Sequence, residues 1–149
     1  MGAEFSLRPG DGADADWIAE LRAVVMRPDL ERLDRYDADR VRRRFTDGYR
    51  PEHTRIVELD GVSVGCIAAR VEEDAVWIEH FYLDPSVQGR GIGGAVLRRV
   101  MAEEALGDRP FRLDVLRGSA ARRLYERHGF RWERPEGEWD EILVTAGGE

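Results

Sequence analysis

Seven residues, QGRGIGG at positions 88–94, constrain this chain most, because four of them are glycines set between two apolar segments. After them, Ile92, Val96 and Val100 recur every four residues, as on one face of a helix. The first turn of a helix has unpaired N–H groups and carries about half a positive charge. Glycines let a phosphate oxygen approach those donors, and Arg90 adds a full charge. The stretch therefore predicts a phosphate-binding turn that opens a helix, the alternative being a merely flexible strand-to-helix turn.

Two common phosphate motifs do not fit this stretch. The P-loop requires Gly-Lys followed by Ser or Thr, which is missing here. The dinucleotide fingerprint G-x-G-x-x-G matches Gly89, Gly91 and Gly94, but residues 84–88 separate it from the preceding strand. The chain that follows is too short for the remaining strands of a nucleotide fold. A nicotinamide-dependent oxidoreductase is therefore a disfavoured interpretation.

The pattern elsewhere predicts one domain over residues 1–149, with a frayed tail at 146–149. Asp60 and Gly61 form a two-residue hairpin turn, and Pro28 is expected to end the first helix. The expected strands are 4–10, the two arms of a hairpin over 54–71, 75–83, 111–116 and 138–144. The expected helices are 14–26, 37–45, 92–106 and 119–129. An antiparallel part thus comes first, and one strand–helix–strand crossover follows.

Composition excludes several function classes. With 149 residues, 42% of them hydrophobic, and a net charge of −7, the chain has a real core and is not expected to bind nucleic acid. Cys66 is the single cysteine, and His53, His80 and His128 lack metal-ligand spacing, so no disulfide and no metal site are expected. No apolar run reaches the roughly 18 residues of a membrane span. The N-terminus lacks a signal-peptide pattern, so a cytoplasmic protein without membrane contact is expected.

Three blocks together resemble a known family. Residues 88–93 fit an acyl-CoA loop of the pattern Gln/Arg-x-x-Gly-x-Gly/Ala. Residues 78–87, IEHFYLDPSV, look like that family's fourth strand and its following turn, and residues 115–130, VLRGSAARRLYERHGF, like its C-terminal block. On these blocks the chain resembles the GNAT superfamily of acyl-CoA-dependent N-acyltransferases over residues 54–130. The resemblance implies an α/β (α+β) GNAT fold: a mixed, mostly antiparallel central sheet, helices on both faces, and a splay between strands 4 and 5.

The resemblance also implies where acetyl-CoA, the expected acyl donor, is held. Its pyrophosphate would lie on backbone N–H groups of the glycine loop, and its pantetheine would follow the fourth strand like an added strand. Ser119 stands where the family usually has Asn, and its hydroxyl has a shorter reach. The implied cofactor-binding residues are Phe81, Tyr82, Leu83, Gln88, Gly89, Arg90, Gly91, Ile92, Gly93, Gly94 and Ser119.

Attack of an amine on a thioester requires two proton transfers, each typically worth about 10²–10⁴ in rate. Tyr125 occupies the family's general-acid position and would protonate the CoA sulfur, although as a residue type it also suits a core. Glu79 is the first candidate for the base, because a strand that alternates regularly places it among aromatic side chains that raise a carboxyl pKa. An outward-facing Glu79 is the alternative, and a bulge would change its facing. His80, Asp114 and a chain of waters remain candidates for the base.

The expected function is direct transfer of the acetyl group from acetyl-CoA to a primary amine in a ternary complex. A covalent acetyl-cysteine route is disfavoured, because Cys66 lies within an apolar strand and reads as a buried structural thiol. The acceptor is a small molecule or a peptide, and its site is expected at residues 26–50 and the C-terminal segment. Dimerisation is common in the family, so a homodimer is one state that the resemblance allows. The alternative function is a non-catalytic acyl-CoA-binding or regulatory domain.

Overall fold

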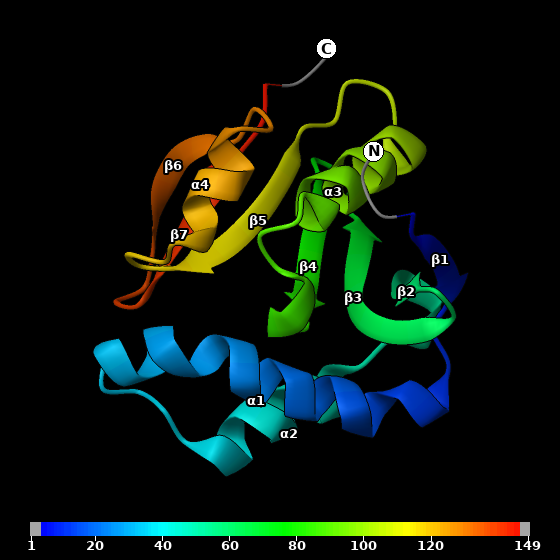
Figure 1. Cartoon of the computed structure of the whole chain (residues 1–149). Helices are drawn as coiled ribbons and strands as arrows, with labels where there is room; N and C mark the ends of the chain where they lie inside the picture. Colours follow the sequence, from blue (N-terminus) through cyan, green and yellow to red (C-terminus); the bar gives the residue numbers. More distant parts are fainter. Residues whose placement is uncertain (1–3, 147–149) are drawn as a thin grey trace. The chain divides into compact units, whose positions relative to one another are not determined.

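A computed structural model of the chain describes residues 4–146 (Figure 1). The predicted tail, 146–149, lies outside the described residues from Gly147 onward. The strands in residues 4–146 are β1 (Ser6–Pro9), β2 (Thr54–Leu59), β3 (Val62–Val71), β4 (Val76–Leu83), β5 (Phe111–Leu116), β6 (Arg131–Glu136) and β7 (Asp140–Val144). The α-helices are α1 (Ala15–Arg32), α2 (Ala38–Gly48), α3 (Ile92–Glu104) and α4 (Ala121–Glu126), and short 3₁₀ turns are η1 (Gly12–Asp14), η2 (Pro51–His53) and η3 (Pro85–Val87).

The described strands form one seven-stranded sheet in the order β1-β2-β3-β4-β5-β7-β6. The pairs β1–β2, β2–β3, β5–β7 and β6–β7 are antiparallel, whereas β4 and β5 are parallel. The expected mixed, mostly antiparallel sheet is therefore confirmed. The register joins β4 to β5 at Val76 and Trp77.

The hairpin turn between β2 and β3 is the one predicted. Asp60 and Gly61 both have positive φ, 52° and 77°, as a type I′ turn requires. Asn, Asp and Gly tolerate this left-handed backbone better than other residues do. The Asp-Gly pair therefore fixes the register that places the buried residues Ile56 and Cys66 opposite each other.

The expectation that Pro28 ends the first helix is wrong, because α1 continues to Arg32. Proline removes one hydrogen bond, to the carbonyl four residues earlier, and it tends to bend a helix. The last turn also contains two ion pairs, Arg27 to Glu31 at 2.8 Å and Arg32 to Asp29 at 3.1 Å. Each such exposed pair adds only a few tenths of a kcal/mol, which offsets part of the cost of the proline.

The C-terminal third departs from the prediction in two places. Strand β6 was not expected, since its residues are almost all exposed and show no apolar alternation. It is an edge strand, where Pro135 is tolerated. Helix α4 is also shorter than 119–129, because its last turn tightens: the N–H of His128 donates to the Tyr125 carbonyl, three residues back. Gly129, at φ 93°, then ends the turn.

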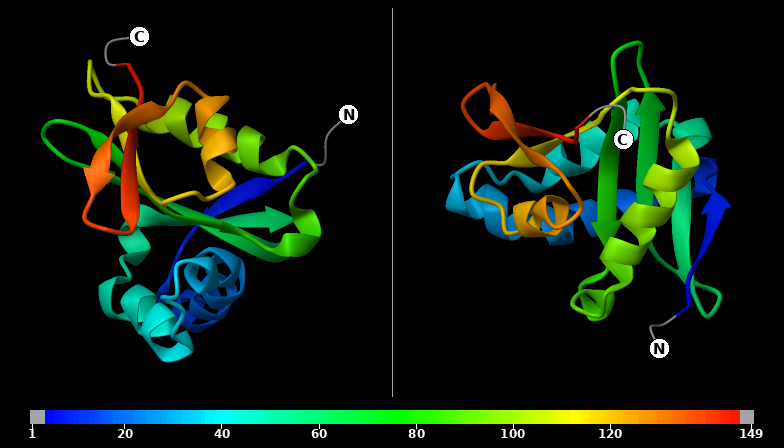
Figure 2. Two further views of the ribbon diagram at one scale, coloured as in Figure 1. Left: turned by 90° about the vertical axis from the view of Figure 1, so that its left-hand side faces the viewer. Right: turned by 90° about the horizontal axis from the view of Figure 1, so that it is seen from above.

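The chain has two compact units. The first comprises residues up to Ala68 together with His80–Ile92, and the second comprises Ala69–Glu79 together with the chain from Gly93 onward. In the first unit α1 and α2 pack side by side (Figure 2). Its core cluster contains the buried residues Ile18, Ala19, Phe45, Ile56 and Cys66, with Trp17, Tyr49 and Tyr82 packed against them.

The second unit buries side chains from α3, α4 and the strands β5 and β7. Helix α3 places its apolar positions four residues apart, as the repeat at 92, 96 and 100 predicts. Strand β5 buries every second residue, beginning at Phe111. The fully buried members of this unit include Val96, Leu97, Val100, Leu113, Ile142 and Leu143.

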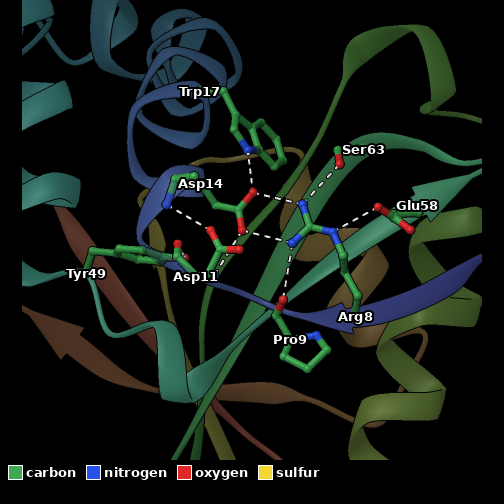
Figure 3. A network of polar contacts seen from close by, with 9 residues as sticks. Arg8, Pro9, Asp11, Asp14, Trp17, Tyr49, Glu58 and Ser63 are labelled. Carbon is green, nitrogen blue, oxygen red and sulfur yellow. Dashed lines mark hydrogen bonds and ion pairs between the residues drawn. The ribbon is translucent and has the colours of Figure 1, made fainter.

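A network of polar contacts around Arg8 and Asp14 fixes the start of α1 to β1, β2 and β3 in the first unit (Figure 3). Asp14 is 4% exposed and accepts from Arg8 at 2.9 and 3.0 Å, and from the Trp17 indole at 2.8 Å. The guanidinium of Arg8, partly offset by burial of the carboxyl, lowers the pKa of Asp14 to about 2. Arg8 also binds Glu58 at 2.9 Å and Ser63 at 3.4 Å.

Candidate active site

The glycine loop between η3 and α3 has the conformation that its composition predicts. Gly89 and Gly91 have φ of 77° and 80°, a left-handed backbone that other residues rarely adopt. No described heavy atom lies within 4 Å of where a Cβ would stand on either glycine. The two glycines are thus required by the backbone, and α3 begins directly after them at Ile92. Before the loop, the Gln88 side chain donates a hydrogen bond of 2.8 Å to the Leu83 carbonyl and so ties the loop to the end of β4.

Gly94, in the first turn of α3, has a different role within the second unit. A Cβ on Gly94 would stand 3.1 Å from Cε1 and 3.2 Å from Nε2 of the His128 ring. His128 Nδ1 donates to the Leu124 carbonyl at 2.8 Å, and its Nε2 accepts from Arg98 at 3.1 Å. A carbonyl only accepts and a guanidinium only donates, so these contacts assign the donor role to Nδ1 and the acceptor role to Nε2. Gly94 therefore makes room for the His128 ring, a long-range contact that the sequence does not reveal.

The second half of β4 does not alternate regularly. His80 has φ of 48°, a left-handed conformation inside a strand that costs about 1–3 kcal/mol. The Cys66 thiol donates to the His80 carbonyl at 3.1 Å, and the Phe45 ring meets the His80 ring edge-on at 5.1 Å. These contacts hold the irregular backbone in place. The regular alternation that would put Glu79 on the same face as Phe81 is therefore broken at position 80.

Strands β3 and β4 approach each other closely at Gly65 in the first unit. A Cβ on Gly65 would lie 2.3 Å from the Tyr82 carbonyl oxygen and 2.7 Å from Cδ2 of Leu83. No side chain fits there without moving the backbone of β4. Gly65 therefore allows the backbone of residues 81–83 to lie this close to β3. In the sequence it is only one glycine within an apolar strand.

Glu79, the first candidate base, lies in the second unit and is paired with a cation. Its Oε2 is 3.0 Å from Nη2 of Arg70, and Nε of Arg70 is 3.3 Å from both carboxylate oxygens. The same guanidinium lies over the Trp77 ring at 5.7 Å and binds Glu72. Glu79 therefore faces a cation rather than a row of aromatic side chains.

Asp114, the third candidate, lies on β5 close to two acidic residues of the neighbouring strands. Partial burial, followed by the effects of Asp140 and Glu136, raises the pKa of Asp114 to about 8. Two carboxyl groups that share a hydrogen bond cannot both ionise cheaply. Asp114 therefore holds its proton more tightly than an ordinary carboxyl group does.

Tyr125 and Ser119 belong to the segment that forms α4. Tyr125 is 8% exposed and its ring packs edge-to-face on Phe130, with centroids 5.8 Å apart. Ser119 Oγ accepts from the backbone N–H of Ala121 at 3.2 Å. The Ser119 hydroxyl proton is not used in that bond, so the side chain can still donate one hydrogen bond.

The sequence did not predict a polar cluster that lies in the first unit. Arg22 of α1 donates from Nε to the Tyr82 hydroxyl at 2.9 Å, and Nδ1 of His80 lies 2.9 Å from the same hydroxyl. Arg22 also donates from Nη1 to the Val41 carbonyl of α2. The three side chains come from positions 22, 80 and 82, and nothing in the local pattern relates the first to the others.

Two further groups bear on the chemistry. Burial raises the pKa of the Cys66 thiol to about 12, so it is held as a thiol rather than as a nucleophilic thiolate. Among residues 4–146, no group of three or more His, Cys, Asp or Glu side chains is arranged to hold a metal ion. None of the described helices is long and apolar enough to cross a membrane.

Comparison with known proteins places these features in a family context. Residues 50–132, more than half of the chain, match the family model of the acetyltransferase (GNAT) domain. No curated protein sequence matches the chain. Among solved structures, the PaiA N-acetyltransferase from Thermoplasma acidophilum, in complex with coenzyme A, superposes with a TM-score of 0.75 at 17% identity, covering 96% of this chain and 99% of that one.

Two other solved structures extend the comparison. The ribosomal-protein-S18-alanine N-acetyltransferase from Escherichia coli has a TM-score of 0.68 at 16% identity, covering 98% of this chain and 96% of its own. The N-acetylglutamate synthase from Neisseria gonorrhoeae, complexed with coenzyme A and N-acetyl-glutamate, has a TM-score of 0.69 at 20% identity. All of this chain aligns with 36% of that synthase. At these identities the likenesses show a shared fold.

Proposed function

Since this chain belongs to the GNAT acetyltransferase family, we propose that it is an acetyl-CoA-dependent N-acetyltransferase acting as one domain over residues 1–149. It transfers the acetyl group directly to a primary amine of a small molecule or peptide in a ternary complex. The observation that carries the proposal is the left-handed pair Gly89 and Gly91 at the start of α3, inside the region that matches the family.

Cofactor binding is proposed for the residues that the family resemblance implies. Backbone N–H groups of the loop and of the first turn of α3 bind the pyrophosphate, where the helix dipole favours an anion. The main chain of β4 binds the pantetheine as an added strand, as the family resemblance implies. Ser119 donates one hydrogen bond. The full proposed set is Phe81, Tyr82, Leu83, Gln88, Gly89, Arg90, Gly91, Ile92, Gly93, Gly94 and Ser119.

In the proposed reaction, the amine nitrogen attacks the thioester carbonyl carbon and forms the C–N bond. Collapse of the tetrahedral intermediate breaks the C–S bond, and the leaving thiolate receives a proton from the hydroxyl of Tyr125. Main-chain N–H groups of β4 stabilise the oxyanion. The burial of Tyr125 supports this role, because a proton donor in a water-poor environment loses its proton to the thiolate rather than to solvent.

The base that accepts the amine proton is proposed to lie on β4, at Glu79 or His80. The Glu79 carboxylate is already bound by Arg70 at 3.0 Å. His80 Nδ1 lies beside the Tyr82 hydroxyl, and an imidazole is the commonest general base. These contacts favour His80. Replacing the true base should remove the acid limb of the pH profile of kcat/KM, so profiles of Glu79→Gln and His80→Gln separate the two residues.

The rival function is a non-catalytic acyl-CoA sensor, which needs the glycine loop but not Tyr125. A thiol-release assay with a panel of primary amines distinguishes the two functions. For an enzyme, Tyr125→Phe should lower kcat by about 10²–10⁴, with acetyl-CoA affinity unchanged in calorimetry. Wild-type protein that binds acetyl-CoA but acetylates no amine contradicts the enzyme proposal and supports the sensor.

A further inference from the structure

Arg22 is a half-buried cation whose surroundings supply no counter-charge. It lies on α1 of the first unit and donates to two neutral oxygens, the Tyr82 hydroxyl at 2.9 Å and the Val41 carbonyl at 2.5 Å. A guanidinium has five N–H groups. Two are used, so three have no protein partner among residues 4–146.

The carboxylate of Glu20, two residues before Arg22 on the same helix, is engaged elsewhere, because it pairs with Arg42 of α2 at 2.8 Å. No carboxylate of the described residues lies within ion-pair distance of Arg22. Removing a charge from water without pairing it is unfavourable, so a half-buried guanidinium without an anion is an exception that needs a reason.

Fastening α1 to β4 does not by itself supply that reason. The two bonds that Arg22 makes are to a hydroxyl and a carbonyl, and a neutral donor would satisfy both. What only a guanidinium provides is a planar fork of donors that fits a carboxylate with two parallel hydrogen bonds. The ring of Phe45 against His80 makes the surroundings less polar, which strengthens a charge pair formed there.

Arg22 is also linked to the segment on which the proposed chemistry depends. Its Nε and the His80 ring share the Tyr82 hydroxyl, and Tyr82 lies in the stretch proposed to hold the pantetheine. We propose that Arg22 binds a carboxylate of the acceptor, so that the substrate class is an amine that also carries a carboxylate, such as an amino acid. This inference rests on the proposed acetyltransferase function and narrows its acceptor. Position 22 precedes residues 26–50, where the acceptor site was expected from the sequence.

The test measures selectivity rather than activity alone. Wild-type protein is assayed with acetyl-CoA and a panel of amino acids, each paired with its carboxamide, which keeps the amine and removes the negative charge. We expect kcat/KM to favour the acids by at least tenfold, and Arg22→Gln to reduce that preference about 10- to 100-fold, the usual worth of a charge-assisted hydrogen bond. Arg22→Lys keeps the positive charge but lacks the two parallel donors of a guanidinium. Its preference for the acids should lie between those of wild type and Arg22→Gln. The control is Arg99→Gln on α3, an exposed arginine outside the expected acceptor segments that should leave the preference unchanged.

A binding measurement tests whether Arg22 binds a carboxylate even if no amino acid of the panel is turned over. The Nε–Hε NMR signal of Arg22, assigned by its loss in Arg22→Lys, is followed in the presence of CoA during titration with N-acetyl amino acids and with their amides. We expect the acids, but not the amides, to shift this signal. If acetyl-CoA binds while neither measurement shows a preference for the carboxylate, or if the preference survives in Arg22→Gln, the inference is wrong. If acetyl-CoA itself does not bind, the proposed function fails instead.

Discussion

Two arginines fasten α1 to the sheet of the first unit, and they differ in what they are paired with. Arg8 makes five hydrogen bonds, to two carboxylates, a carbonyl and a hydroxyl, and so uses every N–H that it has (Figure 3). Arg22 makes two bonds, both to neutral oxygens. A fully paired charge is a structural fastening that leaves no place for a ligand. A guanidinium with unused N–H donors is able to bind a ligand. The following predictions test whether Arg8 and Arg22 differ in this way.

The largest expected effect is on stability at the fully paired site. Asp14→Asn leaves the Arg8 guanidinium without its main partner, and breaking a buried pair typically costs about 3–5 kcal/mol. Because Arg8 is 33% exposed, we expect the lower end, about 3 kcal/mol, in urea unfolding. Arg22→Gln should cost about 1–2 kcal/mol, because it removes two hydrogen bonds but no charge pair. Arg27→Gln, which breaks an exposed pair, is the matched control. Equal losses in the free energy of unfolding for Asp14→Asn and Arg22→Gln would show that Arg8 and Arg22 have the same structural role.

Acid should weaken the Asp14 site in a defined pH window. The pKa of Asp14 is lowered to about 2 in the folded protein from the ordinary 3.8, so its contribution is present above about pH 4 and lost as the pH falls towards 2. A shift of this size corresponds to about 2 kcal/mol. Urea unfolding between pH 5 and 2 should show this loss in wild-type protein but not in Asp14→Asn. The same slope in both proteins would mean that other carboxyl groups cause it.

Removing the Tyr82 hydroxyl tests the partly paired site. Tyr82→Phe deprives both Arg22 Nε and His80 Nδ1 of their shared partner and keeps the β4 backbone. We expect a loss of about 1–2 kcal/mol, because two hydrogen bonds are removed and each contributes about 0.5–1.5 kcal/mol net. Acetyl-CoA affinity should stay unchanged, because the proposed cofactor contacts of Tyr82 are main-chain. A loss as large as that of Asp14→Asn would show that Arg22 is as structural as Arg8.

A third arginine, Arg98, belongs to the contact with the smallest expected effect on stability. Arg98 donates to His128, whose ring lies where a Cβ of Gly94 would stand. Alanine is favoured over glycine in a helix by about 1 kcal/mol, but here the His128 ring offsets that gain. We expect Gly94→Ala to be nearly neutral in wild-type protein and stabilising by about 1 kcal/mol in a His128→Ala background. Equal effects in both backgrounds would show that the ring contact has no energetic weight.

The parts of the fold that follow local rules were predictable from the sequence. The Asp60-Gly61 turn, the start of α3 at Ile92 and strand β5 all lie where turn chemistry and periodicity place them. Pro28 and β6 were misjudged, because α1 continues through its proline to Arg32 and because β6 is held by pairing with β7 rather than by an apolar alternation of its own. Local preference is a weak guide wherever tertiary contacts supply the larger free energy.

The sequence predicted only those parts of the candidate site whose backbone conformation calls for a particular residue type. Glycine at positions 89 and 91 indicates a left-handed backbone, whereas His80 adopts one although histidine gives no such indication. The meeting of Arg22 with Tyr82 joins residues 60 positions apart in the chain, and the pairing of Glu79 with Arg70 depends on how β3 and β4 face each other. No periodicity specifies such contacts, so these features required the structure.

The most direct test of the acetyltransferase proposal is calorimetric titration with acetyl-CoA, with NADH as the parallel ligand. Wild-type protein should bind acetyl-CoA and not NADH. Gly91→Val puts a branched side chain at φ 80° and should weaken acetyl-CoA binding at least tenfold, whereas Gly107→Val, at φ 58° in the turn after α3, should not. Binding of NADH in place of acetyl-CoA, or equal affinity in wild type and Gly91→Val, would contradict the assignment of the glycine loop and the catalytic roles built on it.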